Sequence, residues 1–278
     1  MRRPFRSMNK RKLLTGPYLA FVLCGTIIPL LAIVYYGFTD RQGHLTLQNL
    51  LAISEPEHAK ALWLSLLLAL ICTVICFLLA YPIGLLLRRT GGAKKGFIIF
   101  VLILPMWMNF LLRTMAWRAL LANNGVINSI LHAAGLPGIS IIGTPAAVVL
   151  GMVYDFLPFM ILPIYNVMVK IDNRLIEAAQ DLGSNRFQVL WHIILPLSVP
   201  GIISGVTMVF VPAMTTFAIS NILGGGKIYL IGNIIEQEYT VAGNWQTGSG
   251  LSLVIMIFIL ISMALINKFD KNGEGSML

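Results

Sequence analysis

Long apolar stretches separated by short polar connections make up most of this chain. Six of these stretches are long enough to cross a hydrocarbon core of ~30 Å as helices. Helices are expected because backbone groups in lipid must be paired within the protein, and no alternating pattern typical of a barrel is present. The sequence therefore predicts an all-α integral membrane protein whose transmembrane domain covers residues 13–268. The six predicted transmembrane helices lie at about residues 14–38, 60–87, 97–121, 144–169, 194–222 and 250–267.

The composition of the chain points to the same class. Only 11% of its 278 residues are charged and 57% are hydrophobic, whereas a soluble domain has roughly 25% charged residues. The formal net charge of +9 does not indicate a nucleic-acid partner, because the basic residues flank the apolar stretches instead of forming a stripe with aromatic residues. The first apolar stretch, from about Leu13 to Phe38, follows a basic segment as in a signal peptide. It is too long for one and is interpreted as a retained span.

The distribution of lysine and arginine predicts the orientation of the spans. Fifteen of these residues lie in the N-terminal tail, the loops after the second and fourth spans and the C-terminal end, against three in the opposite loops. Cytoplasmic segments carry this excess, so the tails at residues 1–12 and 269–278 are both expected to be cytoplasmic in a multi-pass protein of the cell membrane. The outer loops hold an amphipathic stretch, Val126–Ala134, which is expected to form a short interfacial helix.

Residues that usually bind metals or carry out catalysis are sparse in this sequence. Cys24, Cys72 and Cys76 all lie inside apolar runs, and the last two are four residues apart on one helix face. They could form a metal pair, but no histidine or carboxylate is near them in sequence, so packing is the preferred interpretation. The four histidines lie in or near loops without metal-ligand spacing, and no nucleophile–base set is evident. Neither a metal site nor a membrane-embedded enzyme is predicted.

The loop from Asp172 to Pro196 has the pattern of a short amphipathic helix outside the membrane. Asp172 or Asn173 can cap its N-terminus, and Gly183 lies where the helix would end. Its apolar positions recur at helical spacing, at Leu175, Ile176, Ala179 and Leu182. Such an apolar face needs a partner, which is either the membrane surface or another protein.

A sequence motif in this loop favours the protein partner. A Glu-Ala-Ala triplet is followed after three residues by a glycine and after nine more by an isoleucine, one residue and Leu-Pro. The motif residues are Glu177, Ala178, Ala179, Gly183, Ile193, Leu195 and Pro196. This pattern resembles the EAA loop of ATP-binding-cassette (ABC) importer permeases in residue type and spacing. The small alanines would allow close approach to a groove wall, Gly183 would allow a sharp turn, and Pro196 would start the next span. The resemblance implies a coupling helix that docks in an ATPase cleft and passes its closure to the spans.

No nucleotide-binding motif accompanies this loop. The pattern G-x-x-x-x-G-K-[ST] is absent from the sequence, and the run Gly224–Lys227 lacks its length and its strand–helix context. The resemblance to importer permeases therefore implies that a separate ATPase subunit binds ATP and Mg²⁺. This chain is expected to carry no cofactor and not to be an enzyme itself.

Three further stretches resemble permeases of spermidine/putrescine importers of the PotB type. They are Leu104–Asn128, Tyr154–Asp172 and Pro212–Ile235, and the similarity extends from about residue 60 onward. The resemblance implies a type I ABC importer permease fold of the MetI-like kind and a polyamine as the transported solute. It also implies a second permease chain in a heterodimer, two ATPase subunits and an extracytoplasmic solute-binding protein.

The candidates for the solute path are Trp107, Arg113, Trp117, Tyr154 and Asp155. Asp155 is the acidic residue within a predicted span, and carboxylates and aromatic faces suit a polycation. Trp107 and Trp117 lie ten residues apart on one predicted span and would share a broad face. The alternatives are an interfacial position for the tryptophans and a structural pair of Asp155 with Arg113 or Arg118.

The two arginines of the predicted third span leave the substrate open. A polycation should avoid unpaired guanidinium groups, and Arg113 and Arg118 would suit an oxyanion. The same architecture serving an amino acid or an oxyanion is therefore the main alternative. A secondary transporter is less favoured, because the sequence has no convincing internal repeat and few ionisable residues at mid-membrane.

Overall fold

The computed structural model describes residues 17, 19–90 and 92–274. The basic tail predicted at residues 1–12 and the last residues of the predicted C-terminal tail lie outside this part of the chain. The described residues are helical apart from turns, loops and an isolated β-bridge between Thr39 and Leu45, which confirms the all-α prediction. They form two compact units, one built from residues up to Glu55 together with Ile235–Ile257, the other from Pro56–Ile234 together with residues from Phe258 onward.

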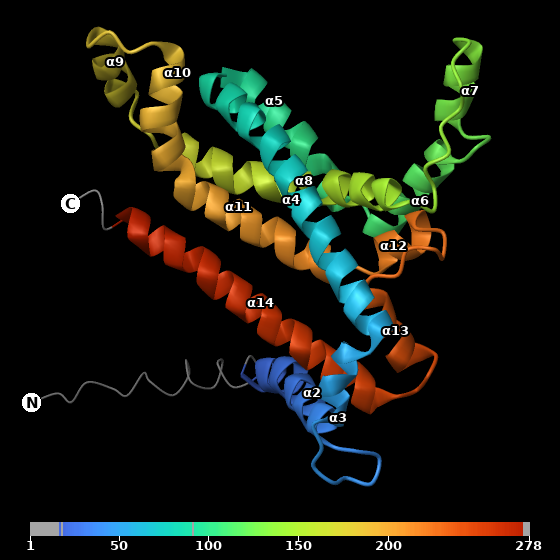
Figure 1. The fold of residues 1–278 in the computed structure, drawn as a ribbon. Coiled ribbons are helices and arrows are strands. Elements are labelled where there is room, and N and C mark those ends of the chain that lie inside the picture. Colours follow the sequence, from blue (N-terminus) through green and yellow to red (C-terminus); the bar gives the residue numbers. More distant parts are fainter. Residues whose placement is uncertain (1–16, 18, 91, 275–278) are drawn as a thin grey trace, which may run out of the picture. The chain divides into compact units, whose positions relative to one another are not determined.

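Figure 1 shows the helices in chain order. The helices of the described part are η1 (Leu23–Ile27), α2 (Ile28–Phe38), α3 (Gln48–Leu51), η2 (Ala52–Ser54), α4 (Pro56–Arg89), α5 (Gly92–Ile103), η3 (Leu104–Trp107), α6 (Phe110–Leu121), α7 (Val126–Ala133), α8 (Pro145–Met168), α9 (Asn173–Asp181), α10 (Arg186–Val189), η4 (Leu190–Ile194), α11 (Leu195–Thr215), α12 (Ala218–Leu223), α13 (Ile231–Thr240) and α14 (Trp245–Glu274). By length and composition, five helical runs in the described part could cross a membrane, and a bent pair of helices would make a sixth.

The helices α4, α8 and α11 pack on one another and form the core of the larger unit (Figure 1). Small residues allow α4 to approach α8 closely. Cys72, Cys76, Ala80 and Gly84 recur every four residues along α4 and are all buried. The thiol of Cys76 lies 3.8 Å from the carbonyl oxygen of Val153 in α8. The two cysteines therefore lie in helix packing, and the described residues contain no group of three or more His, Cys, Asp or Glu that could hold a metal ion.

A pair of glycines brings α11 against α8 in the same way. Gly201 and Gly205 have the G-x-x-x-G spacing that lets membrane helices come into backbone contact. A Cβ atom on Gly201 would lie 2.9 Å from the carbonyl oxygen of Pro163, and one on Gly205 would lie 2.7 Å from the sulfur of Met160. The contact therefore leaves no room for a side chain at either position.

Two π-helical turns each end two residues before a proline. They are η1, which precedes Pro29, and η4, which precedes Pro196. A proline has no N–H donor and its ring crowds the carbonyl of the preceding turn, and a widened turn relieves this crowding. As a result, α10, η4 and α11 form one helical run, Arg186–Thr215. The sequence predicts that this span starts at about residue 194 with Pro196; the helix instead begins at Arg186 and passes through the proline.

The stretch predicted as one continuous helix at residues 97–121 is broken in the structure. The helical runs Gly96–Trp107 and Phe110–Ala133 are bent by 95° relative to each other. Asn109 caps the second run, because its side-chain oxygen accepts hydrogen bonds of 3.0 and 3.3 Å from two amides of the first turn of α6. The expectation of a single uninterrupted third span is therefore wrong.

The span predicted at residues 194–222 also ends early, because α11 stops at Thr215 and α12 is a separate short helix. The fully buried side chain of Asn233 holds this turn. It accepts a hydrogen bond of 2.6 Å from the hydroxyl of Ser220 and donates one of 3.0 Å to the carbonyl of Phe217. A buried polar side chain with its partners in place fixes the backbone around it.

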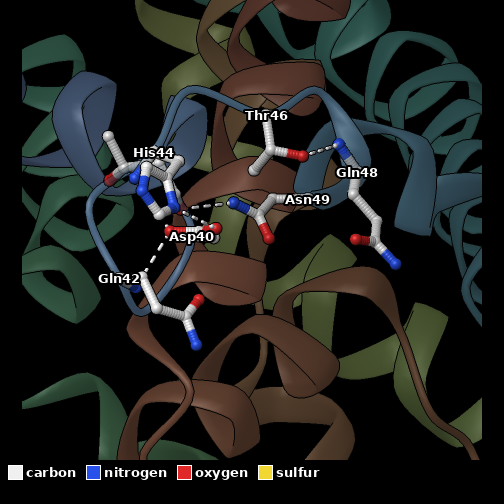
Figure 2. Close-up of polar contacts among 7 residues, drawn as sticks. Asp40, Gln42, His44, Thr46, Gln48 and Asn49 are labelled. Atoms are coloured by element: carbon white, nitrogen blue, oxygen red, sulfur yellow. Dashed lines mark hydrogen bonds and ion pairs between the residues drawn. The ribbon is translucent and has the colours of Figure 1, made fainter.

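In the smaller unit, short-range polar contacts hold the loop after α2 (Figure 2). The carboxylate of Asp40 accepts hydrogen bonds of 2.9 Å from the amides of Gln42 and His44. Backbone hydrogen bonding, chiefly from His44, lowers the pKa of Asp40 from its ordinary value. Asn49 donates to carbonyl oxygens at the end of α2, the nearest being that of Thr39 at 2.9 Å. The side chain of Asn49, in α3, therefore closes the C-terminus of α2.

We predict that Gly201→Ala destabilises the protein although alanine is the better helix former. The added methyl group would crowd the carbonyl of Pro163, and overpacking of this kind costs ~1–3 kcal/mol. Gly96→Ala is the matched control, because nothing lies within 4 Å of a Cβ at that position in α5. Thermal unfolding of the purified protein in detergent should give a lower midpoint for Gly201→Ala and an unchanged or higher one for Gly96→Ala. Equal midpoints for the two variants would contradict the close packing of α11 on α8.

Candidate functional site

The predicted coupling loop contains a separate short helix, α9. Asp172, one of the two residues predicted to cap it, accepts a hydrogen bond of 3.0 Å from the amide of Arg174. The apolar positions of the helix are largely uncovered, since Leu175 and Leu182 are 51% and 88% exposed. A helix with an uncovered apolar face at the end of a bundle is typical of a docking element.

Gly183 ends α9 in a left-handed backbone conformation, with φ of +87°. Its amide donates to the carbonyl of Gln180 at 2.8 Å, and the amide of Ser184 donates to the carbonyl of Ala179 at 2.9 Å. These two bonds make a Schellman motif, which satisfies carbonyls that a helix end would leave unpaired. A side chain at Gly183 would meet nothing within 4 Å, so the backbone conformation is what requires glycine here.

The remaining motif residues are distributed over α9 and the helical run after it. In α9, Glu177 and Ala178 are exposed and Ala179 is half-buried. Beyond the turn, Ile193 lies in η4, and Leu195 and Pro196 begin α11; these three are half-buried or exposed. The motif therefore covers two helices joined by the turn at Gly183.

A groove of about 700 Å³ lies between α9, the end of α4 and the helical run that starts with α10. Charged residues on its lining are Arg88, Arg89, Glu177 and Arg186. The side chain of Arg88 forms hydrogen bonds with the end of α8 and with Asn173 at the start of α9. Sequence reasoning used Arg88 only as a charge that sets orientation. Its partners lie 80 to 85 residues away along the chain, so no local pattern could have identified this contact.

A buried ion pair joins α6 to α8. The Nε atom of Arg113 lies 2.6 Å from Oδ1 of Asp155, and the two side chains are 8% and 5% exposed. The guanidinium of Arg113 also donates to the carbonyl oxygen of Pro105 in η3. It lies 5.6 Å from the centre of the Tyr154 ring, and the ring of Trp117 packs edge-on against the same tyrosine at 5.2 Å. Four of the five candidates for the solute path therefore form one cluster.

The fifth candidate, Trp107, is not part of this cluster. Its side chain is 87% exposed and lies in η3, on the other side of the bend from Trp117 in α6. The prediction that the two tryptophans share one helix face is therefore wrong, because it assumed a continuous helix. Of the two arginines considered as partners of Asp155, the structure selects Arg113, while Arg118 is exposed.

The surroundings of Asp155 are apolar on the side of the aromatic residues. A groove of about 660 Å³ is lined by Trp117, Tyr154 and apolar residues of α4 and α8. Both carboxylate oxygens of Asp155 and the Nε of Arg113 are buried and have no hydrogen-bond partner among the described residues, so the contact between the two side chains is an ion pair. The negative charge of Asp155 is thus balanced by Arg113, and its side chain, 5% exposed, is not part of the polar surface of this chain.

Comparison with known proteins identifies relatives of this chain. Residues 80–272 match the family described as "Binding-protein-dependent transport system inner membrane component". The chain is 34% identical over 269 residues to the spermidine/putrescine transport system permease protein PotB of Haemophilus influenzae, with 94% of each chain covered. It is 38% identical over 214 residues to PotB of Escherichia coli K12, with 76% of this chain and 78% of the relative covered.

A solved structure extends the likeness to the fold. A chain of a bacterial ABC transporter involved in the import of the acidic polysaccharide alginate superimposes with a TM-score of 0.81 and 15% sequence identity. The likeness covers 95% of this chain and 97% of that one, and it confirms the predicted ABC importer permease fold. Because the family match covers more than half of its residues, this chain is a multi-pass membrane protein that belongs to the family of inner membrane components of binding-protein-dependent transport systems.

Proposed function

We propose that this chain is a permease subunit of an ABC importer for polyamines such as spermidine and putrescine. The observation that carries the proposal is the 34% identity, over 94% of both chains, to a permease named for spermidine/putrescine transport. Family membership indicates binding-protein-dependent transport, and the names of the relatives indicate a polyamine as the solute.

The proposal includes several partners. A second permease chain completes the solute path, two ATPase subunits bind ATP and Mg²⁺, and an extracytoplasmic solute-binding protein delivers the polyamine. The binding-protein dependence in the family description supports the last of these. The excess of lysine and arginine supports an orientation with both termini in the cytoplasm, which places α9 on the side where ATP is available.

The helix α9 is the proposed coupling helix. Its exposed Leu175 and Leu182 offer apolar contacts, and Ala178 lets the helix backbone approach the wall of a cleft. The turn at Gly183 joins it directly to the helical run Arg186–Thr215. A displacement of α9 by ATP-driven closure would therefore reach the core of the larger unit through a rigid helix.

The charges of the buried cluster favour a polycation over an oxyanion. Arg113 is paired with Asp155 and donates to the carbonyl of Pro105, so its positive charge is balanced within the protein. An oxyanion site needs guanidinium donors directed at the ligand. The aromatic faces of Tyr154 and Trp117 suit an organic cation. We assign the ion pair a structural role, in which it holds the broken segment before α6 against α8 and thereby shapes the solute path.

The substrate is tested with the purified importer, reconstituted with its ATPase and solute-binding protein. Spermidine or putrescine should stimulate ATP hydrolysis and be taken up into proteoliposomes, because the loaded binding protein triggers the closure that α9 transmits. Sulfate and an acidic oligosaccharide serve as anionic controls and should give neither effect. Uptake of an anion without uptake of either polyamine would contradict the proposed solute.

The coupling role of α9 is tested with Gly183→Leu. A left-handed conformation costs an L-residue ~1–2 kcal/mol, so the turn after α9 should change while the spans stay inserted. We expect loss of uptake with ATP hydrolysis no longer stimulated by the loaded binding protein. The matched control is Gly135→Leu, at the end of α7, where φ is +73° and nothing lies within 4 Å of a Cβ. Its hydrogen bonds form the same Schellman motif. Equal losses in both variants would contradict a specific coupling role.

The structural role of the ion pair is tested with Asp155→Asn. This variant leaves Arg113 buried without a counter-charge, which costs ~3–5 kcal/mol, so the yield of folded protein should fall. The double variant Asp155→Asn with Arg113→Gln removes both charges and should recover part of that yield. Arg118→Gln, an exposed position on the same helix, is the control and should behave as the wild type. Normal yield of Asp155→Asn with reduced uptake would instead place Asp155 on the solute path.

A further inference from the structure

Arg88, the penultimate residue of α4, forms three hydrogen bonds around the start of α9. Its Nε donates to the carbonyl of Met168 at 2.9 Å, and its Nη2 donates to the carbonyl of Ile171 at 3.1 Å and to Oδ1 of Asn173 at 2.8 Å. Met168 is the last residue of α8, Ile171 lies in the connection, and Asn173 is the first residue of α9. A single side chain thus ties α4 to the whole connection between α8 and α9.

The packing of α4 on α8 sets the position of Arg88. A Cβ on Gly84 would lie 3.2 Å from the sulfur of Met168 and 3.3 Å from a methyl carbon of Ile164, so the two helices are in close contact at this level. Arg88 follows Gly84 by four residues and therefore lies on the same face, one turn further along. There it meets the last carbonyl of α8, that of Met168, at the end of the helix that carries the negative end of the helix dipole.

Few other contacts attach α9 to the helix core. The helix packs most closely on α10, and the groove of about 700 Å³ lies between it and the end of α4. Arg88 bridges this gap with its bond to Asn173. The residue can do so because a planar guanidinium directs several donors at once, whereas a lysine ammonium acts as a point charge on a flexible stem.

We propose that Arg88 is a positioning residue that links the coupling helix to α4, so that displacement of α9 moves α4 directly. Without this link, displacement of α9 would reach the core through the two chain connections, to α8 and to α10. The inference rests on the proposed function, in which α9 docks on an ATPase. It adds a third route of transmission, through a residue outside the EAA motif.

The test compares Arg88→Gln with Arg89→Gln in the reconstituted importer. Both variants remove one positive charge from the same end of α4, and Arg89 is exposed. We expect Arg88→Gln to lower the amount of solute taken up per ATP hydrolysed roughly tenfold, within the usual range of coupling between sites. Arg89→Gln should leave this ratio unchanged. Arg88→Lys, which keeps the charge but not the planar fork, should recover only part of the ratio.

If Arg88→Gln does not assemble into the importer, Asn173→Ala tests the link between α4 and α9 instead. It removes only the α9 end of the link and leaves both carbonyl bonds of Arg88 in place. Its ratio should fall as in Arg88→Gln, and the double variant should be no worse than the poorer single one, because both changes break one link. A normal ratio in Asn173→Ala, or equal ratios in Arg88→Gln and Arg89→Gln, overturns the proposal. Wild-type importer without solute-stimulated ATP hydrolysis would instead refute the proposed function, so the two failures are distinguishable.

Discussion

In the hydrocarbon core every backbone donor and acceptor must find its partner within the protein, because water is absent there. The apolar segments of this chain meet this requirement in different ways where they depart from the α-helix. At the break before α6, Asn109 accepts from free amides and Arg113 donates to the carbonyl of Pro105. Before Pro196 the helix widens into η4 and does not break. The 95° bend and the continuous run Arg186–Thr215 are thus two solutions to one constraint.

The constraint also explains why charged residues lie inside a membrane segment of this chain. Arg113 adds a side-chain donor to the carbonyl of Pro105 in η3, which also accepts from the amide of Met108, but a buried guanidinium needs a counter-charge. Asp155 provides it from the adjacent helix, at 2.6 Å. The break, the arginine and the aspartate therefore form one structural unit. In the structural role proposed for it, this intramembrane carboxylate, which the sequence marks as a candidate for the solute path, supports the backbone through Arg113.

The sequence predicts some elements better than others, according to how far apart the deciding residues lie. Helix α9 could be predicted because its cap Asp172, its apolar spacing and Gly183 all lie within a dozen residues of one another. The break in the third span could not be predicted, because the hydropathy of that span is continuous. Prolines do not mark breaks either, since Pro82 and Pro158 both lie inside uninterrupted helices. The contacts of Arg88 depend on the packing of two helices that are distant in sequence. Local pattern carries no information about such packing.

The attachment of α9 suits the docking role proposed for its exposed surface. A helix that keeps its apolar face free for another protein cannot use that face to pack on its own core. It must therefore be held at its ends, by groups that leave the face open. The turn at Gly183 holds one end through backbone bonds, and the bond from Arg88 to Asn173 holds the other. A helix fixed at both ends transmits a push as a rigid body, whereas one fixed at a single end would pivot. In the proposed coupling role, the polar contacts at the two ends therefore allow an exposed, weakly packed helix to transmit a displacement.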